Sequence, residues 1–352
     1  MVALIKDVSM QVLVTGASGF IGSQVARVLA QKGFKLRLLL RKTSSLENLE
    51  GLNFETAYGD LNDVDALRQA VRGVDYVVHL AGIITAKNFR EFYRYNAEGT
   101  KNLAQACVDE QLSGSTHIKR FIYISSLAAA GPSGASNNQG ILGPILRTEE
   151  ETPAPVSHYG RSKLQGEIDL KALAEFPVTV IRPPVVYGPR DKAIFDFVKL
   201  LKAGIRPVFR GENSAREKYI SVIYVDDLVN GIVQSVIVAS GRKSFEVFFL
   251  ADDGMNTMNE MLREMQSALQ ARAIPLPLNK KAIFVLAYAQ ETICRVLNKA
   301  PNLGRDKYHE FAEDFWLCSN QNAKKILGFQ PSVPLKDGSK RTIDWYKASG
   351  WI

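Results

Sequence analysis

The chain has 352 residues, 46% of them hydrophobic and 23% charged, which excludes collagen-like, coiled-coil and disordered chains. Its net charge is +8 (44 Lys and Arg against 36 Asp and Glu), and because the charge is dispersed we expect a basic surface and no nucleic-acid partner. The sequence shows no membrane-spanning run and no signal peptide, so we expect a cytoplasmic protein. Its three cysteines, Cys107, Cys294 and Cys318, are scattered and have no metal-ligand spacing. We therefore expect reduced thiols and no metal.

The first half of the chain alternates short apolar segments with amphipathic ones. Strands are expected at residues 11–15, 35–40, 54–58, 76–80 and 120–125, and helices at residues 21–32, 64–71 and 89–111. This alternation predicts βαβ units and a parallel sheet. Because the strands are apolar on both faces, we expect helices to cover both sides of the sheet.

The alternation breaks at residues 128–155, which are rich in Gly, Pro, Ser and Asn and predict a long loop that is either functional or mobile. The later chain predicts a smaller lobe that partly returns to the sheet. We expect a nucleotide-binding domain at 1–186 plus 222–250 and a lobe at 187–221 plus 251–352. The later helices are expected at 159–176, 225–239, 257–271, 282–297 and 320–327 and near Trp351, and the later strands at 178–182 and 245–250.

A glycine-rich turn, TGASGFIG, follows the first strand and opens the first helix. Its first glycine suits the turn, its second admits a pyrophosphate, and its third lets the helix pack close to the sheet. The helix N-terminus presents free N–H groups and a positive dipole end to phosphates. We therefore expect a dinucleotide site, with a structural turn as the alternative. The expected contacts are Gly16, Ser18, Gly19, Phe20, Ile21 and Gly22.

The tips of the next three strands predict how the cofactor is recognised. Arg41 and Lys42 follow the second strand, with no carboxylate beside them. Since an Arg there suits a 2′-phosphate and a carboxylate suits free ribose hydroxyls, we expect NADP, with NAD as the alternative. Asp60 can accept from the adenine amino group or cap the next helix, and His79 is expected to be a packed strand residue. Further expected cofactor contacts are Leu61, Leu80, Ala81 and Gly82.

A catalytic group is predicted from Tyr159, Lys163 and Ser126. Tyr159 and Lys163 are four residues apart and share one helix face. A Lys ammonium beside a phenol favours the phenolate and lowers the phenol's pKa. We therefore expect Tyr159 to exchange a proton with an alcohol or carbonyl near neutral pH, while Ser126, at the tip of the fifth strand, orients the same oxygen.

Seven motifs follow one another over about residues 10–190: TGASGFIG, GDLND, HLAG, YNAEGTKNL, YISS, YGRSK and IRPPVVYGP. On these motifs the chain resembles the extended short-chain dehydrogenase/reductases, which include nucleotide-sugar epimerases and dehydratases. The resemblance implies a Rossmann-like, doubly wound parallel α/β sheet of about seven strands, a smaller, mostly helical C-terminal substrate lobe, and often a homodimer. It implies a catalytic hydroxyl on Ser126, acid/base chemistry on Tyr159, ribose binding by Lys163 and a structural role for Asn96. Beside the nicotinamide it places Pro183, Pro184 and Val185.

Two branches of this family are candidates. Sugar-nucleotide enzymes usually carry a phosphate-binding Arg at a position that here holds Ile220, and Arg216 lies four residues too early. The segment from residue 36, the RPPVVYGP motif and the ending RTIDWYKASGWI are similar instead to dihydroflavonol-reductase-like and 3β-hydroxysteroid-dehydrogenase-like proteins. We therefore expect an NAD(P)-dependent oxidoreductase acting on a secondary alcohol or ketone of an apolar substrate. A nucleotide-sugar epimerase or dehydratase and a non-catalytic nucleotide-binding scaffold are the alternatives.

The expected helix at residues 282–297 begins with the apolar run AIFVLAYA. Because all-round hydrophobicity indicates burial, we expect this helix in the core of the lobe. As alternatives it lines an apolar substrate pocket or rests on a membrane surface near Lys280 and Lys281, where it is too short to span the bilayer. Either alternative suits a hydrophobic substrate.

Overall fold

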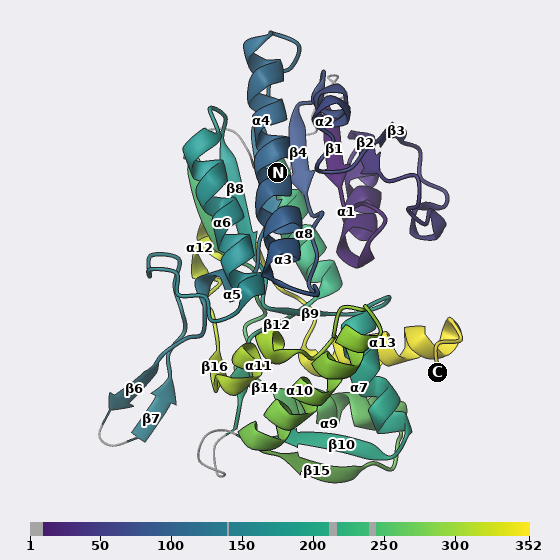
Figure 1. The fold of residues 1–352 in the computed structure, drawn as a ribbon, viewed down its shortest axis with the longest axis vertical. Coiled ribbons are helices and arrows are strands. Elements are labelled where there is room, and N and C mark those ends of the chain that lie inside the picture. Colours follow the sequence, from purple (N-terminus) through teal and green to yellow (C-terminus); the bar gives the residue numbers. More distant parts are fainter. Residues whose placement is uncertain (1–9, 139–140, 211–216, 239–243) are drawn as a thin grey trace.

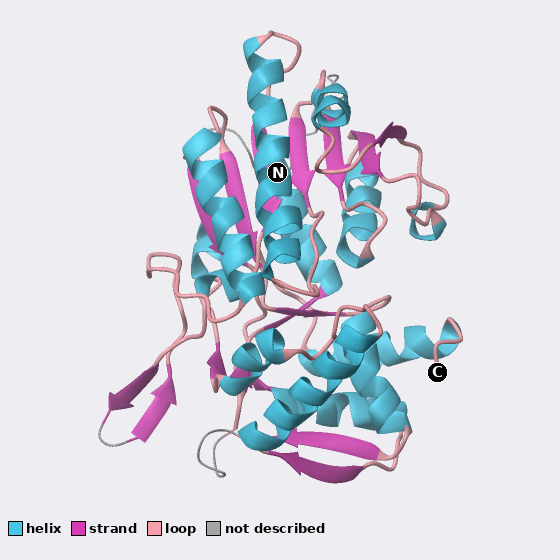
Figure 2. Ribbon diagram, viewed as in Figure 1, coloured by secondary structure: helices cyan, strands magenta, loops and turns pink. Residues whose placement is uncertain are grey.

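A parallel sheet of seven strands forms the centre of the protein (Figures 1 and 2). The computed structural model describes residues 10–138, 141–210, 217–238 and 244–352. The strands lie in the order β13-β8-β5-β4-β1-β2-β3, which confirms the predicted doubly wound α/β fold. They are β1 (Gln11–Thr15), β2 (Lys35–Leu40), β3 (Glu55–Tyr58), β4 (Tyr76–His79), β5 (Arg120–Ile124), β8 (Val178–Arg182) and β13 (Phe245–Phe249).

Two layers of helices cover the sheet, and alternate strand residues enter one layer or the other. Val12 and Val14 pack with α1 (Phe20–Gln31) and α8 (Val225–Ile237), whereas Leu13 packs toward the opposite layer. That second layer consists of α2 (Val64–Val71), α4 (Gly99–Leu112) and α6 (His158–Leu173). The period-two alternation explains why the strand sequences are apolar on both faces.

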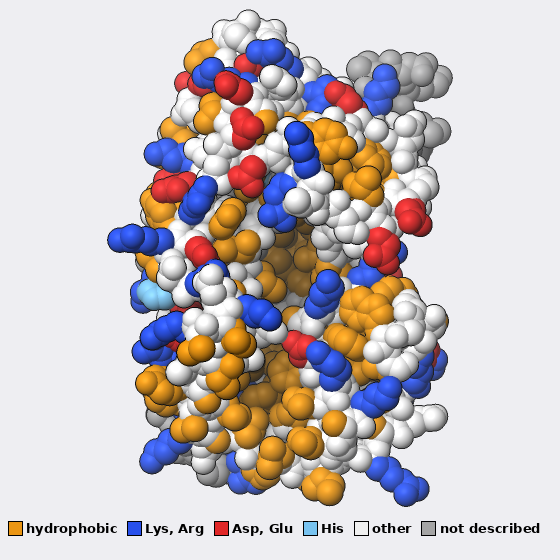
Figure 3. Space-filling model, turned by 45° about the vertical axis from the view of Figure 1, so that its right-hand side comes forward, with side chains coloured by type: hydrophobic (Ala, Val, Ile, Leu, Met, Phe, Trp, Pro, Cys, Tyr) orange, Lys and Arg blue, Asp and Glu red, His pale blue; other side chains and the backbone are white. Residues whose placement is uncertain are grey.

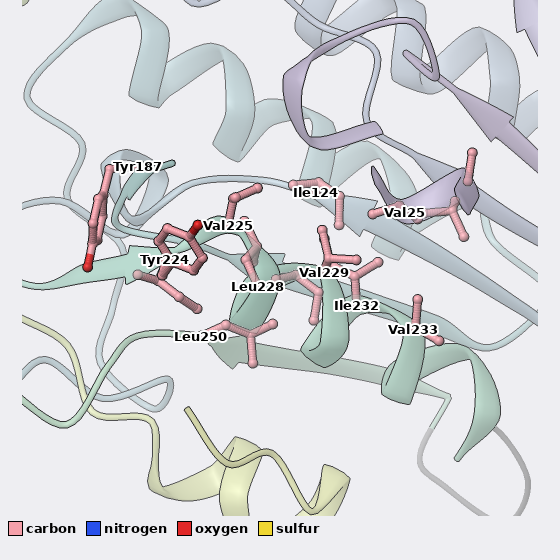
Figure 4. Packing of buried hydrophobic residues seen from close by; sticks show 14 of the residues in the cluster. Val25, Ile124, Tyr187, Tyr224, Val225, Leu228, Val229, Ile232, Val233 and Leu250 are labelled. Carbon is pink, nitrogen blue, oxygen red and sulfur yellow. The ribbon is translucent and has the colours of Figure 1, made fainter. Parts of the chain in front are cut away.

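Helix α8 fills the first layer with branched side chains. Figure 4 shows these side chains close to Val25 of α1 and Ile124 of β5. A short helix, α12 (Gln321–Leu327), packs on α8 and β13, so the late chain returns to the sheet as expected. The buried α8 residues labelled in Figure 4 are Val225, Leu228, Val229, Ile232 and Val233.

The expected helix at residues 89–111 is interrupted. It consists of α3 (Phe89–Phe92), a π-helical turn η2 (Tyr93–Glu98) and α4. Such π-helical turns often occur at functional sites, and this one carries Asn96. A 3₁₀ turn, η1 (Glu47–Leu49), lies between β2 and β3.

The prediction of an irregular loop over residues 128–155 was wrong in part. The segment begins within a short helix, α5 (Leu127–Ala130), and contains an antiparallel hairpin of β6 (Ala135–Asn138) and β7 (Ile141–Pro144). This hairpin is built from Ala, Ser, Asn, Gly and a few apolar residues, so it lacks the alternating pattern by which strands are recognised.

The lobe lies at the carboxyl ends of the strands, below the sheet in Figure 1. It pairs β10 with β15 and joins β14, β11 and β16 in a second small sheet, while β9 pairs with β12. Its strands are β10 (Ile205–Phe209), β11 (Tyr219–Ile220), β14 (Asn256–Thr257), β15 (Ile274–Leu278) and β16 (Phe315–Trp316). The separate pair of β9 (Val185–Tyr187) and β12 (Val222–Tyr224) lies between the main sheet and the lobe (Figure 1). Its helices are α7 (Lys192–Lys202), α9 (Met258–Leu269), α10 (Lys280–Val296), α11 (Arg305–Ala312) and α13 (Leu335–Ala348).

The expectation that the apolar helix α10 is buried in the lobe was wrong. Only Ile283 and Ala287 are buried, and most of the other apolar side chains of the helix are exposed. The helix packs by one narrow stripe on α11 and β15, which leaves the rest of its circumference uncovered. In the described part of the chain, no helix is both long enough and apolar enough to cross a membrane.

Candidate active site

The glycine-rich turn forms a cradle at the start of α1. Gly16 has φ +71°, and a Cβ there would lie 2.7 Å from the backbone N of Ala81. A Cβ on Gly22 would lie 2.2 Å from the carbonyl oxygen of Gly16, whereas at Gly19 only that oxygen, at 3.2 Å, comes near. Among the described residues no side chain caps α1. The first N–H groups of the helix therefore remain available, and the turn fits a dinucleotide pyrophosphate.

The residues predicted to contact the adenosine half of the cofactor lie at the tips of β2 and β3. Arg41 and Lys42 are exposed at the tip of β2, where Ser44 closes a turn on Arg41. Asp60 accepts from the backbone N of Asn62 at 3.0 Å. The alternative that Asp60 caps the next helix was wrong, because Asp63 caps α2 by accepting from Ala66 at 3.1 Å.

Ser126 and Tyr159 meet at the carboxyl end of the sheet. Ser126 is the second residue after β5 and caps α5, accepting from the backbone N of Ala128 at 3.1 Å. Tyr159 lies in the first turn of α6, which begins at the Ser157 cap. The Ser126 and Tyr159 hydroxyls are hydrogen bonded. They can therefore share one substrate oxygen.

Lys163 lies one turn further along α6 and is buried. Its Nζ lies 4.2 Å from the ring centroid of Tyr123, and a Cβ on Gly82 would approach it to 3.9 Å. Burial lowers the pKa of Lys163 to about 7. The carboxylate of Glu167 acts in the opposite direction and raises this pKa, but its effect is smaller. This ammonium therefore loses its proton far more readily than an exposed lysine.

The expectation that Lys163 lowers the pKa of Tyr159 was wrong for this structure. Burial raises the pKa of Tyr159 above its ordinary value of 10.0. The cation that acts in the opposite direction is Lys307, whose Nζ lies 6.0 Å from the Tyr159 ring centroid. The hydrogen bond with Ser126 also lowers the pKa, and Glu310 raises it.

Helix α11 brings three residues to the start of α6 that sequence reasoning missed. Asp306 accepts from the backbone N of His158 at 2.5 Å and of Tyr159 at 3.3 Å. Glu310 accepts from Ser157 at 2.7 Å and pairs with Lys307. A carboxylate at a helix N-terminus is favoured by the dipole, so α11 fixes the turn that carries Tyr159. These residues are about 150 positions from Tyr159, and no local motif marks them.

Buried polar contacts hold the strand tips in place. Glu167 pairs with Arg182 at the end of β8 and accepts from Ser125 at the end of β5. His79 of β4 bonds Thr15 at 2.6 Å and Thr100 at 3.0 Å. Burial, and secondarily the charge of Lys163, lower the pKa of His79 to about 3. His79 is therefore the packed, neutral strand residue that was predicted.

Asn96 links the π-helical turn to the site. Its Oδ1 accepts from the backbone N of Ile83 at 2.8 Å, and its Nδ2 donates to the carbonyl of Ile83 at 3.0 Å and to Ser162 at 3.0 Å. This buried amide therefore fixes the segment after β4 against α6. Both of these elements flank Lys163.

A cavity of about 430 Å³ connects the sheet edge with the lobe, and Figure 3 shows a hollow floored by hydrophobic side chains. The predicted residues that line it are Phe20, Ile21, Leu80, Gly82, Ser126, Tyr159, Lys163, Pro183, Pro184 and Val185. The predicted residues that do not line it are Gly16, Ser18, Gly19, Gly22, Arg41, Asp60, Leu61 and Ala81. Of these, Leu61 is buried against Gly99.

A nucleotide cradle above a Ser, Tyr and Lys group defines an enzyme of the short-chain dehydrogenase/reductase type. The chain belongs to the NAD dependent epimerase/dehydratase family, whose model matches residues 12–247. It is therefore an NAD(P)-dependent oxidoreductase of that superfamily.

Two curated relatives match nearly the whole chain. A ceramide reductase from Caulobacter vibrioides is 28% identical, covering 97% of this chain and 96% of its own. A UDP-glucose 4-epimerase from Vibrio cholerae is 30% identical, covering 94% of each. The fold matches a dTDP-glucose 4,6-dehydratase from Streptomyces venezuelae solved with NAD and TYD, with a TM-score of 0.75 at 23% identity over 97% of this chain and 98% of the other.

Proposed function

We propose that this enzyme transfers hydride between a nicotinamide cofactor and the secondary alcohol or ketone carbon of an apolar substrate. The observation that carries the proposal is the cavity, which opens on Ser126, Tyr159 and Lys163 and is walled by apolar side chains of the lobe. Those side chains are Ile194, Phe197, Phe209, Ile220, Met258 and Phe311.

The mechanism assigns one task to each polar residue. When bound, the nicotinamide supplies or accepts the hydride. The Tyr159 hydroxyl donates a proton to the carbonyl oxygen in reduction and accepts one from the alcohol in oxidation. Ser126 hydrogen bonds the same oxygen and fixes its position. Lys163 would donate to the ribose of the bound cofactor, and the turn from Gly16 to Gly22 would hold its pyrophosphate.

The charges beside the cavity support an apolar substrate over a sugar nucleotide. Lys218 donates to the carbonyls of Phe311 and Glu313 at 2.6 and 2.9 Å and pairs with Asp314 at 3.2 Å. Lys307 pairs with Glu310. Both cations are thus paired with acceptors of the protein itself, whereas a diphosphate needs cations directed toward it. The resemblance to the Caulobacter reductase also supports this substrate class.

The alternative function is a nucleotide-sugar epimerase or dehydratase, which the identity with the Vibrio epimerase favours. A turnover screen separates the two functions. We expect hydrophobic ketones and ring-bearing secondary alcohols to be converted, with little activity on UDP- and dTDP-sugars. The Tyr159→Phe variant is the control, since activity of a contaminating enzyme would persist in it. Activity confined to the sugar nucleotides would reject the apolar substrate and establish the alternative.

The proposed cofactor is NADP, because Arg41 and Lys42 occupy the tip of β2 without a carboxylate. Arg41→Ala is expected to weaken NADPH binding by about 1–3 kcal/mol, the range of a charge-assisted contact, and to change NADH binding little. Lys35→Ala, at the opposite end of β2, is the matched control. Calorimetry that finds equal affinities of the wild type for NADPH and NADH, or NADH the tighter ligand, contradicts the assignment.

We also propose a two-part organisation, with a nucleotide domain at 1–186 plus 222–250 and a substrate lobe at 187–221 plus 251–352.

We further propose a location and an oligomeric state. A cytoplasmic location is supported by the three cysteines, all of which are free thiols. A homodimer through the helices beside Tyr159 and Lys163 is supported by the exposed Ile168 on α6. Sedimentation velocity measures directly whether the protein is a monomer or a dimer.

A further inference from the structure

Helix α10 presents an uncovered apolar face to solvent. At 3.6 residues per turn, five apolar side chains of the helix fall on one side, together with the side chain of Leu297 just after it. Three of the most exposed members are Val285, Ile293 and Val296, with 63%, 59% and 81% of their surfaces accessible. The apolar face of α10 consists of Val285, Leu286, Ala289, Ile293, Val296 and Leu297.

The opposite side of α10 accounts for its contacts with the lobe. Ile283 packs in a cluster with Phe209 and Leu262, and Phe284 stacks edge-on against Tyr308 of α11 at 5.1 Å. No residue of α10 lines the cavity, so the pocket-lining role weighed from the sequence does not hold. The apolar face therefore serves neither the lobe core nor the described cavity.

The segment that precedes the helix also exposes apolar side chains, and the whole segment carries positive charge. Strand β15, which leads into α10, exposes Ile274 and Leu276. Residues 271–300 carry Arg272, Lys280, Lys281, Arg295 and Lys299 against the single acid Glu291, so their net charge is 5 − 1 = +4. Figure 3 shows hydrophobic side chains with Lys and Arg among them over the lower half of the molecule.

We propose that the apolar face of α10, with β15, docks on an anionic membrane surface. Apolar side chains enter the boundary of the acyl chains, while the cations reach the lipid headgroups. A second copy of the chain fits less well, because a symmetric contact through this face would bring the same cations together. Helix α10 has 17 residues, which suits a helix lying in the interface and not spanning the bilayer.

Docking would place the substrate cavity close to the lipid. Helix α10 packs on α11, and α11 contributes Lys307, Glu310 and Phe311 to the cavity wall. An apolar substrate dissolved in the membrane would then have a short path to the site. The docking proposal does not depend on that substrate, since binding to vesicles can be measured without turnover.

Co-sedimentation with vesicles tests the proposal. We expect the wild type to sediment with phosphatidylcholine vesicles containing one quarter phosphatidylglycerol, and to do so less with phosphatidylcholine alone or at high salt. The variant Val285→Ser with Ile293→Asn should bind at least ten-fold more weakly, because it places polar groups on the apolar face. The double variant Arg272→Glu with Lys281→Glu should also bind these vesicles more than ten-fold more weakly than the wild type.

A matched control uses Leu112, which is 72% exposed on α4. Leu112→Ser should bind vesicles as the wild type does, and circular dichroism checks that every variant is folded. Wild-type protein that stays in the supernatant, or α10 variants that sediment normally, would overturn the proposal. So would sedimentation velocity showing that the wild type is a dimer and the α10 variant a monomer while neither binds vesicles.

Discussion

Replacing Tyr159 with phenylalanine should lower kcat by roughly 10²–10⁴-fold, the range of a lost acid/base group. The ring remains, so its packing against Phe92, at a centroid distance of 6.0 Å, is kept. The hydroxyl that bonds Ser126 is removed, and with it the only proton in the proposed mechanism. Cofactor affinity, measured by calorimetry, should stay near the wild-type value because that hydroxyl is not needed to hold the pyrophosphate.

The pH dependence of the wild type adds a second test of Tyr159. Because burial raises its pKa above 10.0, the phenol is protonated at neutral pH. Reduction, which needs that proton, should therefore show a constant kcat/KM through neutral pH. Oxidation, which needs the phenolate, should become faster as pH rises toward the pKa.

Tyr288→Phe serves as the control for Tyr159→Phe, because Tyr288 is exposed on α10 and should tolerate the change. Near-normal turnover by Tyr159→Phe would assign the proton to another group. One alternative is Lys307, which lines the same cavity with its Nζ 6.0 Å from the Tyr159 ring centroid.

The sheet half of the fold was predictable because its signals are local. Strand β1 has Val12 and Val14 on one face and Leu13 on the other, and it ends just before Gly16, whose φ of +71° cannot continue a strand. Its bounds, like those of β2, α2 and β8, agree with the predicted ranges. The hydrophobic pattern and the glycine turn thus contain enough information to locate these elements.

The lobe was much less predictable, because its small elements exist only through distant partners. Tyr219 of β11 pairs with Thr257 on one side and Phe315 on the other, and two-residue strands have no periodicity of their own. Helix α7 was missed although Asp191 caps it, accepting from Ala193 and Ile194 at 2.9 and 3.3 Å. A single cap residue is too common to identify a helix.

The same distinction applies to the site. Ser126, Tyr159 and Lys163 follow from motifs at the end of β5 and the start of α6, where the fold fixes their positions. Asp306, which caps the helix of Tyr159, lies 147 residues further along the chain. It belongs to a short polar helix with no buried residue, so nothing in its local sequence separates it from a solvated surface helix.

Replacing Lys163 with methionine should damage both turnover and cofactor binding. Methionine keeps the aliphatic stem but removes the charge, so the helix should remain packed. We expect kcat to fall by about 10²–10³-fold, as for the loss of one preorganised donor, and affinity for NADPH to fall by about ten-fold or more with the loss of a charge-assisted hydrogen bond. Lys171→Met, two turns along α6 where the side chain is exposed, is the matched control.

The lowered pKa of Lys163 gives this prediction a signature of its own. With a pKa of about 7 in the cofactor-free protein, Lys163 is an ammonium below that pH and largely neutral above it. A ligand that needs the ammonium must restore the proton at higher pH, so the Kd of the wild type should rise as pH increases beyond about 7. Lys163→Met should lack this rise, whereas Tyr159→Phe should retain it. If Lys163→Met kept the wild-type pH dependence, a group other than Lys163 would control cofactor binding, and its ribose-binding role would have to be abandoned.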